Sequence, residues 1–206
     1  FLDAARHQKI GLIIRPPHEV SALAIKGDIV YAGGQEGVFI IDRRSARVVG
    51  MLKRKPNFEY VRDLLIDPDG ILWIAHSKGL TSYDGKEYRD CTTGDGLPDN
   101  RVNCLYRDRE GRLWVGTWGG AACKEGDGWK VITHRDGLAD DMVNVILEDS
   151  AGGMWFGSYA RPKGGVSYCS GRCWVHLTAI NGKLPDANVS TIIEDHRGHI
   201  LIGTGF

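Results

Sequence analysis

Polar and aromatic residues recur at two corresponding places in successive stretches of this chain, and together they could bind a small ligand. One place follows a valine and holds arginine or asparagine, while the other follows a Gly-Thr or Gly-Ser pair and holds tryptophan or tyrosine. Guanidinium, amide and aromatic groups offer charge, hydrogen bonds and stacking surface, which a small-molecule pocket requires. The predicted ligand-binding set is Arg62, Asn103, Trp118, Asn144, Tyr159 and Arg161.

The charge of this set indicates a class of ligand. Arg62 and Arg161 favour an anionic or carboxylate-bearing compound, because a guanidinium pairs with a carboxylate through charge-assisted hydrogen bonds. We expect a small molecule, an oligosaccharide or a peptide. Residues 159–163 are an insertion relative to the other stretches and would close one side of the pocket. The alternative is that Trp118 and Tyr159 only cover loops.

Motifs of known catalytic sites do not occur in the sequence: there is no G-x-S-x-G, no H-E-x-x-H and no G-x-x-x-x-G-K-[ST]. Arg107, Glu148 and Glu194 occupy equivalent places in three stretches, and acid and base groups that converge in this way would suit an enzyme. We predict a binding module without catalytic residues. An enzyme is one alternative, and a protein-interaction scaffold with an exposed apolar patch is another.

Histidines and cysteines are candidates for metal ligands. His196 and His199 have a suitable spacing, but they lie in a turn where the other stretches have Asp-Pro-Asp-Gly or Asp-Arg-Glu-Gly, so we expect solvated side chains. Cys169 and Cys173 flank a predicted hairpin turn, where free thiols and a local disulfide both remain open. Neither pair has the further ligands that zinc needs. We therefore expect no metal and no cofactor.

The overall charge is balanced, with 26 Lys and Arg against 26 Asp and Glu. Because no basic run stands out, we do not expect a nucleic-acid partner. No apolar run is long enough to cross a membrane, so contact with a membrane would come only through segments outside this chain.

An internal repeat supplies the elements that must hold the predicted site. Trp73, Trp114 and Trp155 are 41 residues apart, and Tyr31 and Leu201 take the same place in two weaker copies. Each copy contains four short runs of period two separated by Gly and Asp turns, which predicts a four-stranded antiparallel sheet. Such a sheet cannot bury both of its faces alone. Stacked copies with a period near 40 residues predict an all-β β-propeller.

The period also sets the expected blade boundaries. The two chain ends would be half-blades that either combine into a fifth blade or belong to a larger propeller, and we favour a segment of a larger protein. The bulky residue of each second strand should be buried between blades. Inner strands should start near Val20, Val61, Val102, Val143 and Val189. The boundaries are 1–18 (half-blade), 19–59, 60–100, 101–141 and 142–187 (four whole blades) and 188–206 (half-blade).

With the repeat laid out, residues 95–102 (Asp-Gly-Leu-Pro-Asp-Asn-Arg-Val) and 108–117 (Asp-Arg-Glu-Gly-Arg-Leu-Trp-Val-Gly-Thr) resemble the two-component regulator propeller repeat. The family pattern is GLP-x-N-x-V, then D-x-x-G-x-LW-[IV]-GT, then GG. The blade that starts at residue 101 matches it nearly throughout, whereas the blade that starts at residue 19 departs from it.

The resemblance implies a periplasmic or extracytoplasmic sensor propeller of a bacterial signalling protein. Such propellers usually have seven blades, and a membrane helix joins them to a histidine kinase or GGDEF output module, which would lie outside this chain. A second propeller or a second copy of the chain would then be a further partner. Streptogramin-type lyases and some glycan-cleaving enzymes also use propellers, which gives the enzyme alternative its basis.

Overall fold

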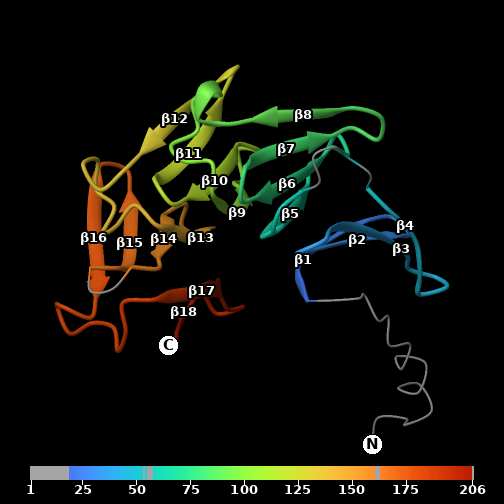
Figure 1. Ribbon diagram of the computed structural model, residues 1–206. Coiled ribbons are helices and arrows are strands. Elements are labelled where there is room, and N and C mark those ends of the chain that lie inside the picture. The colour runs from blue at the N-terminus through green and yellow to red at the C-terminus, as the bar shows by residue number, and fades with distance from the viewer. Residues whose placement is uncertain (1–18, 53, 55–57, 161–162, 206) are drawn as a thin grey trace, which may run out of the picture.

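The computed structural model describes residues 19–52, 54, 58–160 and 163–205, which fold into antiparallel β-sheets that follow one another along the chain (Figure 1). Four sheets have four strands and the last has two, and every sheet is a meander in which neighbouring strands are consecutive in sequence. The one helical element in these residues is a 3-10 turn, η2 (Thr93–Asp95). The expected all-β propeller fold is confirmed.

The strands follow the repeat. The first sheet contains β1 (Val20–Lys26), β2 (Ile29–Gly34), β3 (Gly37–Asp42) and β4 (Arg47–Met51). The second contains β5 (Asp63–Ile66), β6 (Leu72–His76), β7 (Gly79–Tyr83) and β8 (Tyr88–Cys91). The third contains β9 (Val102–Arg107), β10 (Leu113–Thr117), β11 (Gly120–Glu125) and β12 (Gly128–Ile132). The fourth contains β13 (Val143–Glu148), β14 (Met154–Ser158), β15 (Gly165–Ser170) and β16 (Cys173–Thr178), and the fifth β17 (Val189–Glu194) and β18 (Ile200–Thr204).

The first strand of each sheet forms the inner edge of the propeller. Strands β1, β5, β9, β13 and β17 contact one another in that order. Figure 1 shows the sheets arranged along an open arc, with the β1–β4 sheet at one end and the β17–β18 pair at the other. The predicted half-blade at residues 1–18, and its pairing with the last two strands, fall outside the described residues.

One inner strand starts later than the sequence predicts. Strands β1, β9, β13 and β17 begin at the expected valines, but β5 begins at Asp63, two residues after Val61. Just before this point Tyr60 has φ 54°, a left-handed backbone conformation that is uncommon for a residue other than glycine. The N–H of Val61 then donates to the carbonyl of Gly34 in the preceding sheet, at 3.1 Å. The chain therefore contacts the first sheet before it joins its own.

The hydrophobic core lies between successive sheets, where a valine packs against a glycine. A Cβ on Gly116 of β10 would come within 2.9 Å of Val143, and a Cβ on Gly157 of β14 within 2.7 Å of Val189. The glycine of the Gly-Thr or Gly-Ser pair is thus required for close approach of the next sheet. The valines that fill these interfaces are fully buried: Val61, Val102, Val143 and Val189.

An aspartate in the first hairpin turn joins the first two strands of the second, third and fourth sheets. In the third sheet, Asp108 Oδ1 accepts the N–H of Arg112 at 2.8 Å and Oδ2 accepts the indole N–H of Trp114 at 2.8 Å. Burial alone would raise the pKa of Asp108, but the hydrogen bonds from Trp114 and Arg112 outweigh it and hold the pKa below its usual value. Asp67 with Trp73 and Asp149 with Trp155 repeat the arrangement, with indole N–H distances of 3.1 and 2.8 Å.

The three tryptophans pack between blades, as expected, but only Trp114 is fully buried, at 7% exposure. Trp73 and Trp155 are only half-buried, which is less than the sequence predicted. The reason is the residue that the next blade presents. Phe156 covers Trp114 in an edge-to-face contact with ring centroids 5.8 Å apart, whereas Val115 and Ile202 are the equivalent, smaller residues beside Trp73 and Trp155.

Side chains also join the inner strands of neighbouring sheets, whose edge backbone groups would otherwise lack partners. Glu148 Oε2 accepts the N–H of Arg109 at 2.7 Å, which links the fourth sheet to the third. Asp63 Oδ2 accepts the N–H of Leu105 at 2.7 Å, which links the second sheet to the third. Desolvation by burial raises the pKa of Asp63 to about 6, because it outweighs the two backbone hydrogen bonds that favour the charged form.

Replacing the turn carboxylate should destabilise the fold. We expect Asp108→Ala to lower the free energy of unfolding by about 3 kcal/mol, because it removes a charged acceptor and leaves the buried indole N–H unpaired. Urea unfolding measures the change. The exposed turn residue Asp127 gives the control, since Asp127→Ala should stay within about 0.5 kcal/mol of the wild type. Equal effects of the two changes would contradict the assigned role.

The raised pKa of Asp63 predicts a pH dependence of stability. The native state keeps the proton between about pH 4 and about pH 6, where an unfolded carboxyl releases it, so stability falls as pH rises through this window. Relative to Asp63→Asn, the free energy of unfolding of the wild type should fall by about 2–3 kcal/mol between about pH 4 and about pH 7.5. Urea unfolding at both pH values measures the difference, and a pH-independent difference would refute the assignment.

Candidate functional site

The residues that follow the inner-strand valines come together at the propeller axis. Side chains alternate along a strand, so where the valine faces the core, the next residue faces the axis. Ser21, Arg62, Asn103, Asn144 and Ser190, from five successive sheets, line one hollow of about 280 Å³. Two tyrosines, Tyr60 and Tyr159, complete its wall. We call this hollow the axial pocket.

Hydrogen bonds fix the polar side chains of the axial pocket. The amide group of Asn103 donates to the carbonyl of Val143 at 3.0 Å and to the side-chain oxygen of Asn144 at 2.9 Å. In the same way the hydroxyl of Ser21 donates to the carbonyl of Val61. These bonds hold neighbouring inner strands at a constant separation. They leave the amide nitrogen of Asn144 available to a ligand.

Among the described residues, Arg62 is the one charged residue in the lining of the axial pocket. Its guanidinium lies over the ring of Tyr60, 4.9 Å from the centroid, so the aromatic face holds the cation in place. The Nε atom of Arg62 is buried and has no hydrogen-bond partner among the described residues. Buried polar atoms without a partner are rare, so this donor is a candidate for contact with a ligand.

Trp118 supports the axial pocket from outside its lining. Its indole N–H donates to the side-chain oxygen of Asn103 at 3.1 Å, and the guanidinium of Arg101 lies 4.1 Å from the centroid of its ring. Arg101 is itself held by two hydrogen bonds to Asp99. The side chain predicted as a stacking surface for ligand thus also orients Asn103.

Tyr159 lies at the edge of the axial pocket. Tyr159 is 42% exposed, and its N–H donates to the carbonyl of Met142 at 2.9 Å. It pairs with Asn188 in an isolated bridge between the fourth sheet and the fifth. Arg161 falls outside the described residues.

Tyr60 is the lining residue that the sequence analysis missed. It precedes the inner-strand valine, so alternation places it on the same face as Arg62, two residues on. Its ring lies against the guanidinium of Arg62, and its backbone has a positive φ. Alternation was therefore a signal that could have identified Tyr60, whereas the positive φ has no sequence signal at a tyrosine.

The charged residues considered for catalysis lie at the other ends of the inner strands. Glu148 accepts the N–H of Arg109, and Glu194 Oε2 accepts the N–H of Ser150 at 2.7 Å. Arg107 donates to the carbonyl of Gly111 in its own turn. Glu148 and Glu194 thus join neighbouring blades, and none of the three residues lines the axial pocket.

Asp63 lies next to the axial pocket without facing it. It follows Arg62 in sequence, and its two oxygens accept the N–H groups of Leu64, at 2.8 Å, and Leu105, at 2.7 Å. Its pKa is raised by desolvation, as described above. Both oxygens already bind backbone, so the carboxylate is a structural link between two inner strands.

The candidates for metal ligands do not assemble a site in the described part of the chain. His199 Nδ1 lies 3.0 Å from the carboxylate of Asp195 in the same turn, so it has a partner where we expected only solvent. The five cysteines are free thiols. In the β15–β16 hairpin Cys169 pairs with Trp174, and Cys173 pairs with Ser170, so the two thiols are not directly opposite each other.

Comparison with known proteins adds a family and a set of similar structures. The family model of the two component regulator propeller matches residues 96–119, 137–160 and 183–206. No curated protein sequence matches the chain. None of the helices in the described residues is long and apolar enough to cross a membrane.

The solved structures share the fold. The extracellular domain assigned to hybrid two component system BT3049 from B. thetaiotaomicron has a TM-score of 0.78 and 24% identity, over 90% of this chain and 26% of that one. The extracellular domain assigned to system BT4673 of the same organism has a TM-score of 0.74 and 18% identity, over 90% and 28%. Virginiamycin B lyase from Staphylococcus aureus has a TM-score of 0.67 and 12% identity, over 89% of this chain and 62% of that one.

This chain spans about a quarter of the length of the two B. thetaiotaomicron domains, so it corresponds to one part of each. The three matched segments each run from the Leu-Pro or Asp-Gly-Leu loop to the end of the second strand, and they cover the inner strands β9, β13 and β17 with the Asp turn that follows. The sheets repeat this unit around the arc. The chain therefore contains repeats that match the two component regulator propeller family.

Proposed function

We propose that this chain is the ligand-binding part of an extracytoplasmic sensor propeller in a bacterial two-component system. The ligand is a small carboxylate-bearing compound, such as a sugar acid, an oligosaccharide with an acidic group or a peptide, and it binds in the axial pocket. The repeat family and the similarity to extracellular domains of hybrid two component systems support the sensor role and a location outside the cytoplasm.

The observation that carries the proposal is the unpaired guanidinium of Arg62 at the axis. Its Nε is buried without a partner, and the ring of Tyr60 holds the group against the pocket wall. A carboxylate would accept two parallel hydrogen bonds from such a guanidinium. The amide of Asn144 and the hydroxyls of Ser21 and Ser190 would then bind hydroxyl or amide groups of the same ligand.

The lining of the axial pocket favours binding over catalysis. Within the described residues it consists of serines, asparagines, tyrosines and Arg62, with no carboxylate or imidazole to act as a general base near neutral pH. Asp63, Glu148 and Glu194 already accept backbone N–H groups. The similarity to virginiamycin B lyase, at 12% identity, concerns the fold. A membrane helix and an output module would belong to segments outside this chain.

Removing the charge of Arg62 should remove ligand binding and leave the fold intact. A thermal-shift screen of sugar acids, acidic oligosaccharides and peptides identifies the ligand. Its affinity should fall at least about tenfold in Arg62→Gln, because charge-assisted hydrogen bonds contribute about 1.5–3 kcal/mol. Arg47→Gln, on the exposed strand β4, is the matched control and should bind as the wild type does. Unchanged affinity in Arg62→Gln, or conversion of the bound compound to a product, would overturn the proposal.

Trp118 should act on the ligand only through Asn103. Trp118→Phe keeps an aromatic ring for Arg101 and removes the hydrogen bond to Asn103. We expect a loss of about three- to fivefold in affinity for the same ligand, and no further loss when Trp118→Phe is added to Asn103→Ala. Calorimetric titration of the two single variants and the double variant measures this coupling. Additive losses would place the indole in direct contact with the ligand.

A further inference from the structure

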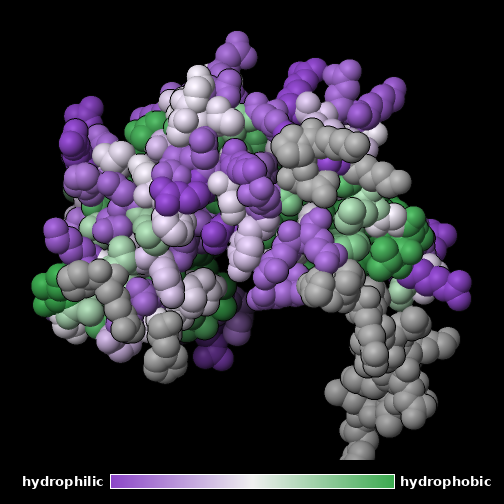
Figure 2. Space-filling view, in the orientation of Figure 1, coloured by the Kyte–Doolittle hydropathy of each residue, from purple (hydrophilic) through white to green (hydrophobic). Residues whose placement is uncertain are grey.

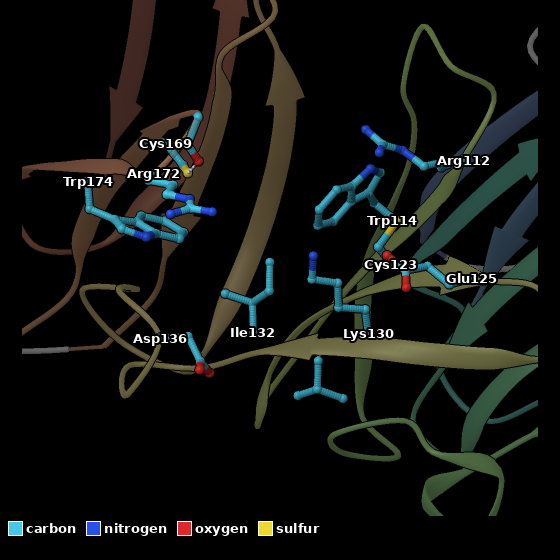
Figure 3. Close-up of a pocket in the computed structure, with 12 residues that line it drawn as sticks. Arg112, Trp114, Cys123, Glu125, Lys130, Ile132, Asp136, Cys169, Arg172 and Trp174 are labelled. Carbon is cyan, nitrogen blue, oxygen red and sulfur yellow. Dashed lines mark hydrogen bonds between the residues drawn. The ribbon is translucent and has the colours of Figure 1, made fainter.

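A second cleft lies between the outer strands of the third and fourth sheets (Figure 3). We call it the lateral cleft. Its volume of about 470 Å³ is larger than that of the axial pocket and falls in the range of small-molecule sites. Arg112 and Arg172 contribute to it from hairpin turns, at the opposite ends of the strands from Asn103 and Asn144. The cleft is therefore separate from the axial site.

Two indole rings form opposite walls of the lateral cleft. Trp114 projects from β10 and Trp174 from β16, while Lys130 and Ile132 rise from β12 into the space between them (Figure 3). Trp174 packs on Phe156, with ring centroids 6.0 Å apart. The indole of Trp174 also packs against the backbone of Gly137, so closely that a Cβ on Gly137 would come within 2.5 Å of the ring. The ring is thus held rigidly and presents a fixed aromatic surface.

The interface between the second and third sheets shows what normally fills this space. There Trp129 stands where Trp174 stands in the next sheet, and its indole N–H donates to the sulfur of Cys91 at 3.1 Å. Its cross-strand partner is Lys124, whose ammonium group lies 5.3 Å from the centroid of the ring. One ring therefore has both a hydrogen-bond partner and a cover.

Both features are missing around Trp174. The cross-strand partner of Trp174 is Cys169, whose short side chain cannot cover the ring as Lys124 covers Trp129. Ile132 stands in the place of Cys91, and its side chain has no acceptor. The indole N–H of Trp174 makes no hydrogen bond to any described residue. The first difference uncovers the ring of Trp174, and the second leaves its indole N–H without an acceptor.

The charges of the lateral cleft also differ from those of the neighbouring interface. Arg172 stands at the turn position that Asp127 occupies in the third sheet, and neither Arg172 nor Lys130 takes part in an ion pair within the described residues. Arg112 is occupied by Asp108, at 2.6 Å, and by Glu110, at 3.0 Å.

The acidic residues of the cleft offset these cations only in part. Asp136 accepts the N–H and the hydroxyl of Thr133, both at 2.9 Å, so its carboxylate is occupied. Glu125 is the one acidic lining residue without a hydrogen bond to a described residue. Two unpaired cations against one unpaired acid leave a single positive charge for a ligand to neutralise.

We propose that the lateral cleft binds a flat aromatic ring that carries a carboxylate. The ring packs on the uncovered face of Trp174 and against Ile132, because offset stacking of aromatic rings is favourable. The carboxylate pairs with Arg172 and Lys130, and such charge-assisted bonds are the strong ones in proteins. This site is independent of the axial pocket and of the function proposed for it.

The experiment uses a matched pair of probes, 2-naphthoate and its neutral amide, 2-naphthamide. Calorimetric titration of the whole chain should show saturable binding of the carboxylate and at least about tenfold weaker binding of the amide. Arg172→Gln should weaken naphthoate binding about tenfold. Lys86→Gln changes the equivalent exposed turn residue of the second sheet and should have no effect. Cys169→Lys should abolish binding by covering Trp174 as Lys124 covers Trp129.

Other outcomes would overturn the proposal. No saturable binding of naphthoate would show that the cleft is a solvent-filled gap, and equal binding of the amide would remove the anionic requirement. Naphthoate affinity that falls in Arg62→Gln but not in Arg172→Gln would place the probe in the axial pocket. Circular dichroism checks that Cys169→Lys is folded, and Arg172→Gln, at an exposed turn, keeps the test decisive if it is not.

Discussion

The second to fifth sheets of this chain each depend on one aspartate carboxylate at the end of the first strand. One oxygen closes the hairpin turn and the other holds the indole of the second strand, so the turn and the inter-blade residue are fixed by the same group. A buried carboxylate without donors would be costly, which makes the two contacts mutually dependent. In the last two strands Leu201 replaces the tryptophan, and His199 takes the free oxygen of Asp195. The carboxylate stays paired even where the indole is lost.

A blade that is fixed in this way can offer the rest of its surface to recognition. Val143 packs closely on Gly116, and Val189 on Gly157, so neighbouring inner strands lie close together. The residue that follows each valine then lies at the axis. Those next residues are serine, arginine or asparagine in different sheets, whereas the valine is constant and the glycine is replaced only by Ala75, in the second sheet. Figure 2 shows mixed polar and apolar side chains across much of the visible face, with apolar side chains gathered at the β1–β4 end.

The repeat predicted the blades because it encodes both the turns and the inter-blade contacts. It also predicted that residues after the valines would meet, and Arg62, Asn103, Asn144 and Tyr159 do line one pocket. It could not predict the backbone of Tyr60, which delays β5 and supplies a wall of that pocket. Nor could it reveal the lateral cleft, because that cleft arises where the short side chain of Cys169 stands in the place of Lys124. A cavity of this kind forms where a side chain is short, and no sequence motif marks it.

The replacement of Lys124 by Cys169 at equivalent positions has a consequence for how such a chain can evolve. The sheets share a framework, so a change at one interface leaves the carboxylate, the turn and the inner strands of every blade as they were. A duplicated blade can thus lose a covering side chain and gain a binding surface without a general cost in stability. Divergence between copies then becomes a supply of new specificities, each tried at one interface while the others keep the molecule folded.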